Sequence, residues 1–399
     1  MKKLNVLTAR TLRQITNNLI VYIPVLLASI YFANKYFYEP FFNGISLLVI
    51  SAMSIFATVT MLNSTKKENI KPENFYTYSS VAFSLSAIIN IILTLLVFLV
   101  TMLRMPYDLT AVAINVLVSG LGAAFFTVYD YKIVEKKEYR NLILTIAVVI
   151  FSVILSLIDF THRITFDITL TTGVALGLAT CFTLFTYSHL KNIKFDIKIF
   201  KESFKNALNI KKYDTKFLAI LPVFALPYIT LINKGTLMTG IMMIGLLVLS
   251  IMLFTWDSVK NNILMTREHS VTLNAVRIKK AVLMLSVTGM FFLILSIGLS
   301  SQILSIFTVP LDYTNAFITL MLNILPFMIV SIILVVYKDV IFFNNININT
   351  MFALIMILGY LILSRFPIIP MGTAIFLLYV VFIGSIIYKT QSLKVKGLK

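Results

Sequence analysis

Twelve predominantly apolar stretches run through this 399-residue sequence, and they restrict its possible folds more than any other feature. A helix needs about 20 mostly apolar residues to cross the hydrocarbon core of a bilayer. Hydrophobic residues make up 59% of the chain and charged residues only 13%, against about 25% charged in an ordinary soluble domain. We therefore predict an all-α integral membrane protein with twelve transmembrane helices. The predicted spans lie near residues 17–34, 43–62, 80–103, 109–129, 142–159, 168–188, 217–233, 236–256, 281–300, 315–337, 350–364 and 371–388.

Lys and Arg residues fall almost entirely on one side of the predicted spans. With the N-terminus inside, only five of the 34 Lys and Arg residues belong to outer loops, namely Lys35, Arg104, Arg163, Lys234 and Arg365. Short cytoplasmic loops of membrane proteins are enriched in positive charge, so the sequence predicts that both termini lie inside. Attraction of these loops to anionic lipid headgroups accounts for the net charge of +18. We therefore predict no nucleic-acid partner.

The residues that usually carry metal, disulfide or catalytic chemistry are scarce. Cys181 is the single cysteine, so no disulfide can form within the chain. The three histidines, His162, His189 and His269, lie in or at the ends of different loops, without a His or Cys partner at metal-ligand spacing. The sequence also contains no P-loop, no nucleophile elbow and no HExxH motif. We predict no metal site, no cofactor and no enzymatic activity.

One basic segment divides the predicted spans into two groups of six. We predict that residues 191–216 form a cytoplasmic linker between an N-terminal lobe, residues 1–190, and a C-terminal lobe, residues 217–399. Apolar residues recur in this linker at steps of three, four and four, which is typical of an amphipathic helix at a membrane surface. They are Ile197, Phe200, Phe204 and Leu208. A regulatory docking site is the alternative.

Six spans of the same orientation in each half predict a parallel internal repeat, from which many transporters are built. The first span of each half contains proline, Pro24 in one and Pro222 and Pro227 in the other. Proline removes a backbone hydrogen bond and permits a helix to bend. Bent helices at equivalent positions suit two lobes that rock against each other. The alternative is proline that the helices merely tolerate.

Ionisable residues are nearly absent from the middle of the predicted spans, where a buried charge costs about a few kcal/mol. Three aspartates at the cytoplasmic ends of even-numbered spans are candidates for ion coupling, namely Asp130, Asp257 and Asp339. Each lies close to a lysine, so local pairing at the interface is the alternative. Asp159 and Asp167 mark outer ends of spans.

Uncharged polar residues do occur within the spans, where they can bond across helices or line a wet cavity that accepts sugar. They are Asn90, Asn115, Thr171, Thr172 and Asn323, with Gln302 near an outer end. Gly173 and Gly177 form a GxxxG motif, which predicts close packing of the sixth span against a neighbouring helix.

The segment that joins the ninth and tenth spans reads LSSQILSIFTVPLDYTNAFITLMLNILPFMIVSIIL, residues 299–334. An apolar helix is followed there by Tyr313, Ala316 and a second long apolar helix. This order resembles the polysaccharide flippases of the MOP superfamily, the Wzx-type transporters related to the lipid II flippase and the MATE exporters. Thr308 stands where that family frequently has a glycine.

The first outer loop reads ANKYFYEPFFNGISLLVI, residues 33–50, and similarly resembles the entry into the second helix of these flippases. Phe42, Asn43 and Gly44 end the matching stretch, and Asn34 replaces an arginine that is common in the family. The layout of spans and the basic middle loop extend the resemblance over nearly the whole chain.

This resemblance implies an architecture and an activity. Such flippases have two six-helix lobes arranged as a V. By alternating access they move an undecaprenyl-pyrophosphate-linked oligosaccharide from the inner to the outer leaflet of the bacterial plasma membrane. For this chain it implies a multi-pass protein of capsule or exopolysaccharide assembly. We predict a monomer, because the two halves supply their own interface. Its partners would be membrane lipids, glycosyltransferases that supply the substrate and a polysaccharide polymerase that consumes it.

The resemblance also implies cations that hold the substrate diphosphate, and the bidentate fork of arginine suits that anion. Arg10 and Arg13, just ahead of the first span, are the candidates on the cytoplasmic side. Arg104, Arg163 and Arg365 at outer ends are the candidates after reorientation. For Arg10 and Arg13, a simple positive-inside anchor is the alternative.

Three other classes of membrane protein are alternatives to a flippase. A major facilitator transporter has the same plan, but the loop after the second span, STKKENIKPENFYTY, lacks the glycine, aspartate and arginine usual there. A polysaccharide polymerase or ligase usually carries a large outer loop, whereas every outer loop predicted here is short. A MATE-type drug exporter normally needs buried acidic residues, and the sequence predicts none.

Overall fold

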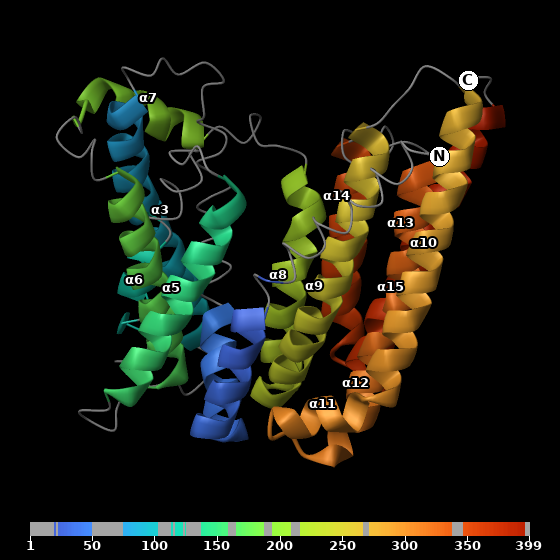
Figure 1. Cartoon of the computed structure of the whole chain (residues 1–399), viewed down its shortest axis with the longest axis horizontal. Helices are drawn as coiled ribbons and strands as arrows, with labels where there is room; N and C mark the ends of the chain where they lie inside the picture. The colour runs from blue at the N-terminus through green and yellow to red at the C-terminus, as the bar shows by residue number, and fades with distance from the viewer. Residues whose placement is uncertain are drawn as a thin grey trace. The chain divides into compact units, whose positions relative to one another are not determined.

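The computed structural model describes 20, 23–49, 75–102, 113–114, 116–122, 124, 137–158, 165–186, 194–208, 216–265, 271–336 and 346–395. Within these ranges the secondary structure is helical throughout, with no strand (Figure 1). The prediction of an all-α protein is therefore confirmed. The count of twelve spans and the inside location of both termini stay predictions.

Helix bounds follow the apolar stretches closely. Three described helical segments are long and apolar enough to cross a membrane: Ile278–Gly298, Leu311–Val330 and Met371–Tyr388. The described helices are residues 23–36 and 38–49, then α3 (Phe75–Met102), α5 (Lys137–Leu157), α6 (Phe166–Thr186), α7 (Ile197–Ala207), α8 (Lys216–Lys234), α9 (Thr236–Met265), α10 (Val271–Gly298), α11 (Ser300–Ile306), η4 (Leu311–Tyr313), α12 (Thr314–Met321), α13 (Ile324–Val336), α14 (Ile346–Leu363) and α15 (Met371–Val395).

The described residues form two compact units. The N-terminal unit comprises the described part of Ile23–Phe217, and the C-terminal unit comprises the described part of Leu218–Lys399 together with Ile20. Each unit has its own apolar core. Aromatic side chains dominate the N-terminal core around Phe166, whose ring lies 4.7 Å from Phe41 and 5.4 Å from Phe32. In the C-terminal unit Phe382 packs on Phe352, with ring centroids 4.7 Å apart.

Each unit begins with two helices joined through a single residue in the left-handed region. In the N-terminal unit this residue is Phe37, with a φ of 57°, between helices 23–36 and 38–49. In the C-terminal unit it is Gly235, with a φ of 86°, between α8 and α9. Glycine adopts this conformation without steric cost and often ends helices in this way. The predicted outer loop between the first two spans is thus reduced to one residue.

Close packing of α6 on α5 depends on two glycines. A methyl group at Gly177 would lie 2.9 Å from the backbone nitrogen of Val148, and one at Gly173 would collide with the hydroxyl of Ser152. Because backbone atoms approach so closely, no larger side chain fits at either position. The structure confirms the prediction made from the GxxxG motif.

The structure differs from the prediction at the tenth span, where one continuous helix was expected over residues 315–337. The helix is broken at Leu322 and Asn323, between α12 and α13. Pro326 provides the physical reason, because it has no N–H and its ring excludes the carbonyl of the residue four positions earlier. The helix therefore restarts at Ile324, which places the proline in the first turn of α13.

The outer loop before this span is also more ordered than predicted. Residues 300–306 form the short helix α11, and Figure 1 shows it running crosswise to α10. Thr308 then adopts a φ of 58°, and the amide of Val309 donates to the carbonyl of Leu304 at 3.0 Å. This residue stands at the position where the flippase pattern frequently has glycine. Thr308 therefore adopts a left-handed backbone conformation that glycine usually adopts.

Candidate functional site

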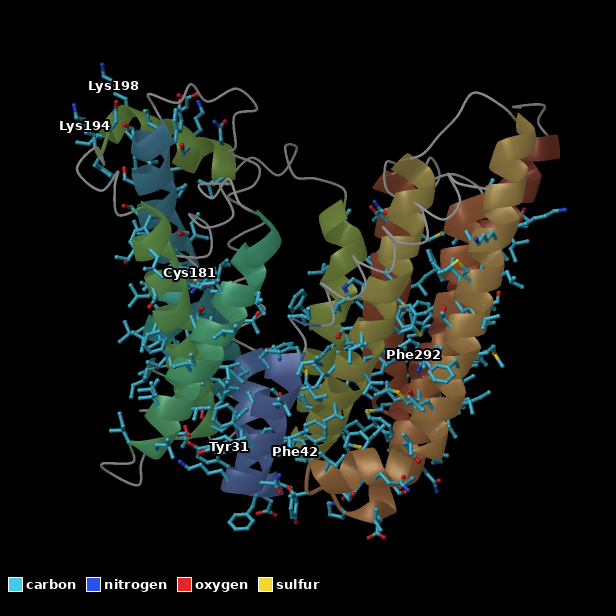
Figure 2. The ribbon with its side chains drawn as sticks, viewed as in Figure 1. Tyr31, Phe42, Cys181, Lys194, Lys198 and Phe292 are labelled. Atoms are coloured by element: carbon cyan, nitrogen blue, oxygen red, sulfur yellow. The ribbon has the colours of Figure 1, made fainter. Side chains whose placement is uncertain are left out.

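Polar contacts tie the first helix of the N-terminal unit to the two helices that follow later in the same unit. A hydrogen bond of 3.3 Å joins the hydroxyls of Tyr31 and Ser156 on α5. A second, of 3.2 Å, joins the hydroxyls of Tyr36 and Thr169 on α6. Figure 2 labels Tyr31 on this first helix and Phe42 on the helix after it. Apolar helices are thus held in register by hydroxyl pairs.

The C-terminal unit makes the equivalent contacts from its own first helix. Thr230 and Tyr360 of α14 share a buried hydrogen bond of 2.6 Å, and Thr230 donates in turn to the carbonyl of Leu226 at 2.8 Å. The side-chain amide of Asn233 donates to the hydroxyl of Ser364 at 2.7 Å. In both units the first helix is therefore bonded to a later helix, α5 in one unit and α14 in the other, near the turn that follows the first helix.

A lysine accompanies this turn in each unit. Lys234 donates from its ammonium group to the carbonyls of Phe366 at 2.8 Å and Ile369 at 3.5 Å. Lys35 instead lies over the ring of Tyr36, 5.5 Å from its centroid, where the negative face of the ring attracts a cation. Both lysines are partly buried, so their charges are directed to local partners.

One acidic side chain is buried in the described N-terminal unit. Asp167 lies in the first turn of α6 and is only 1% exposed. Its carboxylate accepts a short hydrogen bond from the hydroxyl of Thr165, and a helix N-terminus favours negative charge. The sequence placed Asp167 at an outer end but predicted no buried acid, and this prediction was wrong. The hydroxyl and the helix end together make burial of the carboxylate tolerable.

Further polar groups line the buried face of α3. Ser86, Asn90 and Thr94 follow one another at steps of four, so they lie on one side of this helix, and all three are buried. The hydroxyl of Thr94 has no hydrogen-bond partner in the described part of the chain, and neither has that of Ser152 on α5. An unsatisfied buried hydroxyl costs about 1–3 kcal/mol. The hydroxyl of Ser152 is enclosed in the contact between α5 and α6, beside Gly173.

In the C-terminal unit, a buried polar side chain lies at the break between α12 and α13. Asn323 is 1% exposed, and its amide nitrogen donates to Leu320 at 2.9 Å and to Gly372 of α15 at 3.2 Å. Its side-chain oxygen has no partner in the described residues. Broken helices within membranes are found where the backbone is buried in protein or lines a cavity. The amide nitrogen of Asn323 therefore bonds to backbone carbonyls at the break, while its side-chain oxygen is an acceptor that no described residue uses.

Most of the predicted site residues lie outside the described ranges: Arg10, Arg13, Arg104, Arg163, Asp130 and Asp339. Asp257 lies on α9, where its backbone alone is described. Arg365 follows α14 and is exposed, one residue after the buried Ser364. The described structure thus brings none of these predicted residues together. No group of three or more His, Cys, Asp or Glu is placed to hold a metal within the described ranges.

Sequence reasoning missed the residues that make the polar contacts between helices, above all Tyr31, Tyr360 and Asp167. Tyrosines near helix ends read equally well as interfacial anchors. One signal could have indicated Asp167, because threonines flank it in the sequence TFDITLT, residues 165–171, and each can donate a hydrogen bond. Asn90 and Asn323 were identified as polar residues within spans, and both are buried.

Comparison with known proteins supports one fold. No protein-family model matches the sequence, and no curated protein matches it. The backbone is similar to the Vibrio cholerae MATE transporter VcmN, with a TM-score of 0.60 and 12% identity over 99% of this chain and 98% of that one. It is also similar to an inward-facing multidrug resistance MATE transporter of the MOP superfamily, with a TM-score of 0.58 and 12% identity over 96% and 95% of the two chains.

A third similar structure is a MOP superfamily transporter from Pyrococcus furiosus, with a TM-score of 0.55 and 10% identity over 97% of this chain and 95% of that chain. The reversed polarity of its binding pocket was taken to suggest a different function. The fold of this chain is therefore MATE-like, as in the MOP superfamily, while the low identities leave its substrate open.

Proposed function

We propose that this chain is a flippase that moves an undecaprenyl-pyrophosphate-linked oligosaccharide from the inner to the outer leaflet of the bacterial plasma membrane. The observation that supports this best is a MOP-type fold whose described apolar core contains buried hydroxyl and amide side chains, with Asp167 as the one charged residue among the buried polar groups of the described chain. The buried hydroxyl and amide groups of α3, and those at the break before α13, suit a ligand rich in hydroxyls. The two segments that resemble Wzx-type flippases give the same assignment from the sequence.

A flippase has to provide a polar path for the sugar and cations for the diphosphate, while the lipid tail stays in the bilayer. Arg10 and Arg13 would receive the diphosphate on the cytoplasmic side. Arg104, Arg163 and Arg365 would receive it outside. Arginine binds phosphate oxygens through two parallel hydrogen bonds, which suits transfer between such sites. Two lobes that alternate in access would carry the headgroup across, with Asp130, Asp257 and Asp339 as candidates for ion coupling.

The proposed transport step lies between the synthesis of the lipid-linked oligosaccharide and its polymerisation. Glycosyltransferases must assemble the lipid-linked oligosaccharide on the cytoplasmic face before transport, and a polymerase must consume it on the outer face. The chain itself carries out no covalent step. A major facilitator transporter receives no support from the MATE-like fold.

The test is to deplete the protein from its host and to determine which leaflet accumulates undecaprenyl-linked oligosaccharide. Accumulation on the cytoplasmic face, with loss of surface polymer, is the expected result. Single repeat units on the outer face would instead identify a polymerase or ligase. Unchanged levels of every lipid-linked oligosaccharide would refute the proposal. Re-expression of the wild-type chain, beside a variant with Arg10→Gln and Arg13→Gln, tests whether these cations are needed.

The buried Asp167 favours a second candidate, a cation-coupled exporter of small molecules. A buried carboxylate can bind a proton or a cation and so couple a gradient to transport. The matched pair of variants is Asp167→Asn and Asp196→Asn, since Asp196 is a carboxylate that only begins α7. Efflux of a fluorescent cationic dye from cells, abolished by the first change and kept by the second, would favour the exporter. Absence of any dye efflux by the wild type would exclude it.

A further inference from the structure

The helix α7 is fixed to the N-terminal unit, although its sequence lies in the predicted linker. The carboxylate of Asp196 begins the helix by accepting hydrogen bonds from the amides of Lys198 at 2.7 Å and Ile199 at 3.3 Å. Substitution of such an N-cap costs about 1 kcal/mol, so this start is well defined. The side chain of Ser80 on α3 donates to the carbonyl of Lys194 at 2.7 Å.

One face of α7 packs on α3. Ala207 is completely buried and forms a cluster with Leu85 and Ile89 of α3, and Phe200 packs against that cluster. Figure 1 shows α7 at the end of α3, crossing it. This contact fixes the rotation of α7 about its own axis and therefore fixes which side chains face away from the unit.

An apolar strip remains exposed beside the packed face. Ile197, Phe204 and Leu208 are 62%, 38% and 61% exposed. They are separated by seven and four residues, so they lie on one line along the helix. Exposed apolar side chains in a row are found where a surface contacts another molecule or a membrane.

A row of exposed lysines runs beside the apolar strip. Lys194, Lys198, Lys201 and Lys205 follow at steps of four, three and four, and all four are exposed. Figure 2 shows Lys194 and Lys198 projecting away from the ribbon of the unit. The helix thus presents three sides: one packed on α3, one apolar and one cationic.

The position of α7 along α3 identifies the surface that it meets. The apolar part of α3 runs from Ser80 to Leu96. Lys194, just before α7, accepts the hydrogen bond from Ser80, and α7 itself packs on Leu85 and Ile89. The start of α7 therefore lies level with the beginning of the apolar part of α3, which is the level expected for the border between the hydrocarbon core and the headgroups. An amphipathic helix at this depth buries its apolar side by about 5–10 Å and keeps its lysines at the phosphates.

We propose that α7 is a binding site for anionic phospholipid. The apolar strip enters the acyl region, and the lysine row holds the phosphates of lipids with net negative charge. The complementary charge and the depth on α3 select a lipid leaflet over an acidic protein partner. This inference is independent of the transported substrate, because it concerns a surface of one unit alone.

Fluorescence quenching by brominated lipids tests the proposal with the full-length protein in vesicles. Trp256 is the single tryptophan, so a variant with Trp256→Phe and Phe204→Trp carries its only indole on the apolar strip. The vesicles contain phosphatidylcholine and phosphatidylglycerol in a fixed ratio, with bromine on one lipid or on the other. We expect phosphatidylglycerol to bind more strongly at equal mole fraction, by up to about fivefold for each lysine at low ionic strength.

Two further variants give the charge dependence. Lys198→Gln, Lys201→Gln and Lys205→Gln together are expected to remove most of the preference, whereas Lys279→Gln with Lys280→Gln on α10 should retain it, since those exposed lysines lie on the other unit. Equal quenching by both lipids, or a preference that the triple change does not reduce, would overturn the proposal. So would the absence of quenching by either lipid, which would place the strip against water or a protein partner.

A folding control keeps these outcomes distinct. Cys181 is completely buried, so each variant that folds should leave it unreactive toward a thiol reagent before denaturation. Where Phe204→Trp fails this control, Ile197→Trp places the indole on the same strip at a more exposed position.

Discussion

In both units the first helix contacts later helices near the turn that follows it, but different side chains stabilise this contact in each unit. Around its first turn the N-terminal unit relies on aromatic packing, with Tyr36, Phe32 and Phe41 gathered on Phe166. The C-terminal unit relies on short polar bonds, such as the 2.6 Å contact of Thr230 with Tyr360. Equivalent helix positions therefore do not require equivalent residues.

The contact of α5 with α6 in the N-terminal unit and that of α14 with α15 in the C-terminal unit show a second difference. In the N-terminal unit the glycines of α6 face backbone atoms of α5 as well as the side chains of Ser152 and Val148. In the C-terminal unit Gly359 of α14 faces the side chain of Leu378 on α15. Backbone cannot yield to an added atom, whereas the far end of a leucine can. We therefore expect the N-terminal contact to be the more sensitive to substitution.

Alanine at these glycines should produce the largest difference between the units. Gly173→Ala and Gly177→Ala should each destabilise the protein by about 1–3 kcal/mol, because the added methyl overpacks the contact with α5. Gly359→Ala should change stability by less, because alanine favours a helix over glycine by about 1 kcal/mol and Leu378 can move. Unfolding free energies from SDS titration in mixed micelles would measure both. Equal losses in the two units would contradict the distinction between backbone and side-chain contact.

The next largest effect should come from Asn323. Asn323→Ala leaves the carbonyl of Gly372 without its hydrogen bond of 3.2 Å, at a cost of about 1–3 kcal/mol. Asn34→Ala in the N-terminal unit is the matched control, since its exposed amide donates to Ile30 at 2.9 Å within one helix. That control should change stability by less than about 0.5 kcal/mol. The same titration applies, and an equally mild Asn323→Ala would show that the break needs no side chain.

The two left-handed turns should respond with opposite signs. Gly235→Ala should cost about 1–2 kcal/mol, because a Cβ is disfavoured at positive φ. Phe37→Gly should relieve the same strain and stabilise the N-terminal unit, since the ring of Phe37 is 71% exposed and contributes little burial. Melting temperatures in one detergent would compare the two. A loss of stability in Phe37→Gly would mean that this ring has an apolar partner, such as lipid, outside the chain.

Removal of single hydroxyls should give the smallest effects. Tyr360→Phe removes the buried bond to Thr230 and should cost about 1 kcal/mol. Tyr31→Phe removes a longer, partly buried bond of 3.3 Å and should cost about 0.5 kcal/mol. A double-mutant cycle with Thr230→Val and with Ser156→Ala would isolate each pair. A larger coupling energy for Tyr31 would reverse the assignment of polar bonding to the C-terminal unit.

Much of this fold follows from the apolar pattern of the sequence. The eighth and twelfth spans were predicted to begin at residues 236 and 371, where α9 and α15 begin. The glycine contact of α6 followed from the spacing of Gly173 and Gly177. These features are local, so a pattern of residue types determines them.

The candidate site was less predictable, for a physical reason. The hydrogen bond between Thr230 and Tyr360 spans 130 residues of the chain, and no local pattern pairs the two. Burial of Asp167 likewise depends on helices that are distant in sequence. Pro326 could in principle have predicted the break at Asn323. However, the local sequence around a proline does not distinguish one in the first turn of a helix from one in the helix interior.

The bond from Asn323 to Gly372 has a consequence for motion. In the low-dielectric interior a buried carbonyl cannot exchange its donor for water, so α15 cannot slide gradually along α12. A methyl group at Gly372 would also collide with the backbone of Thr319 and Leu320, which leaves no tolerance for small adjustments. We therefore expect displacement at this contact to proceed as a jump from one complete set of bonds to another rather than as a gradual slide.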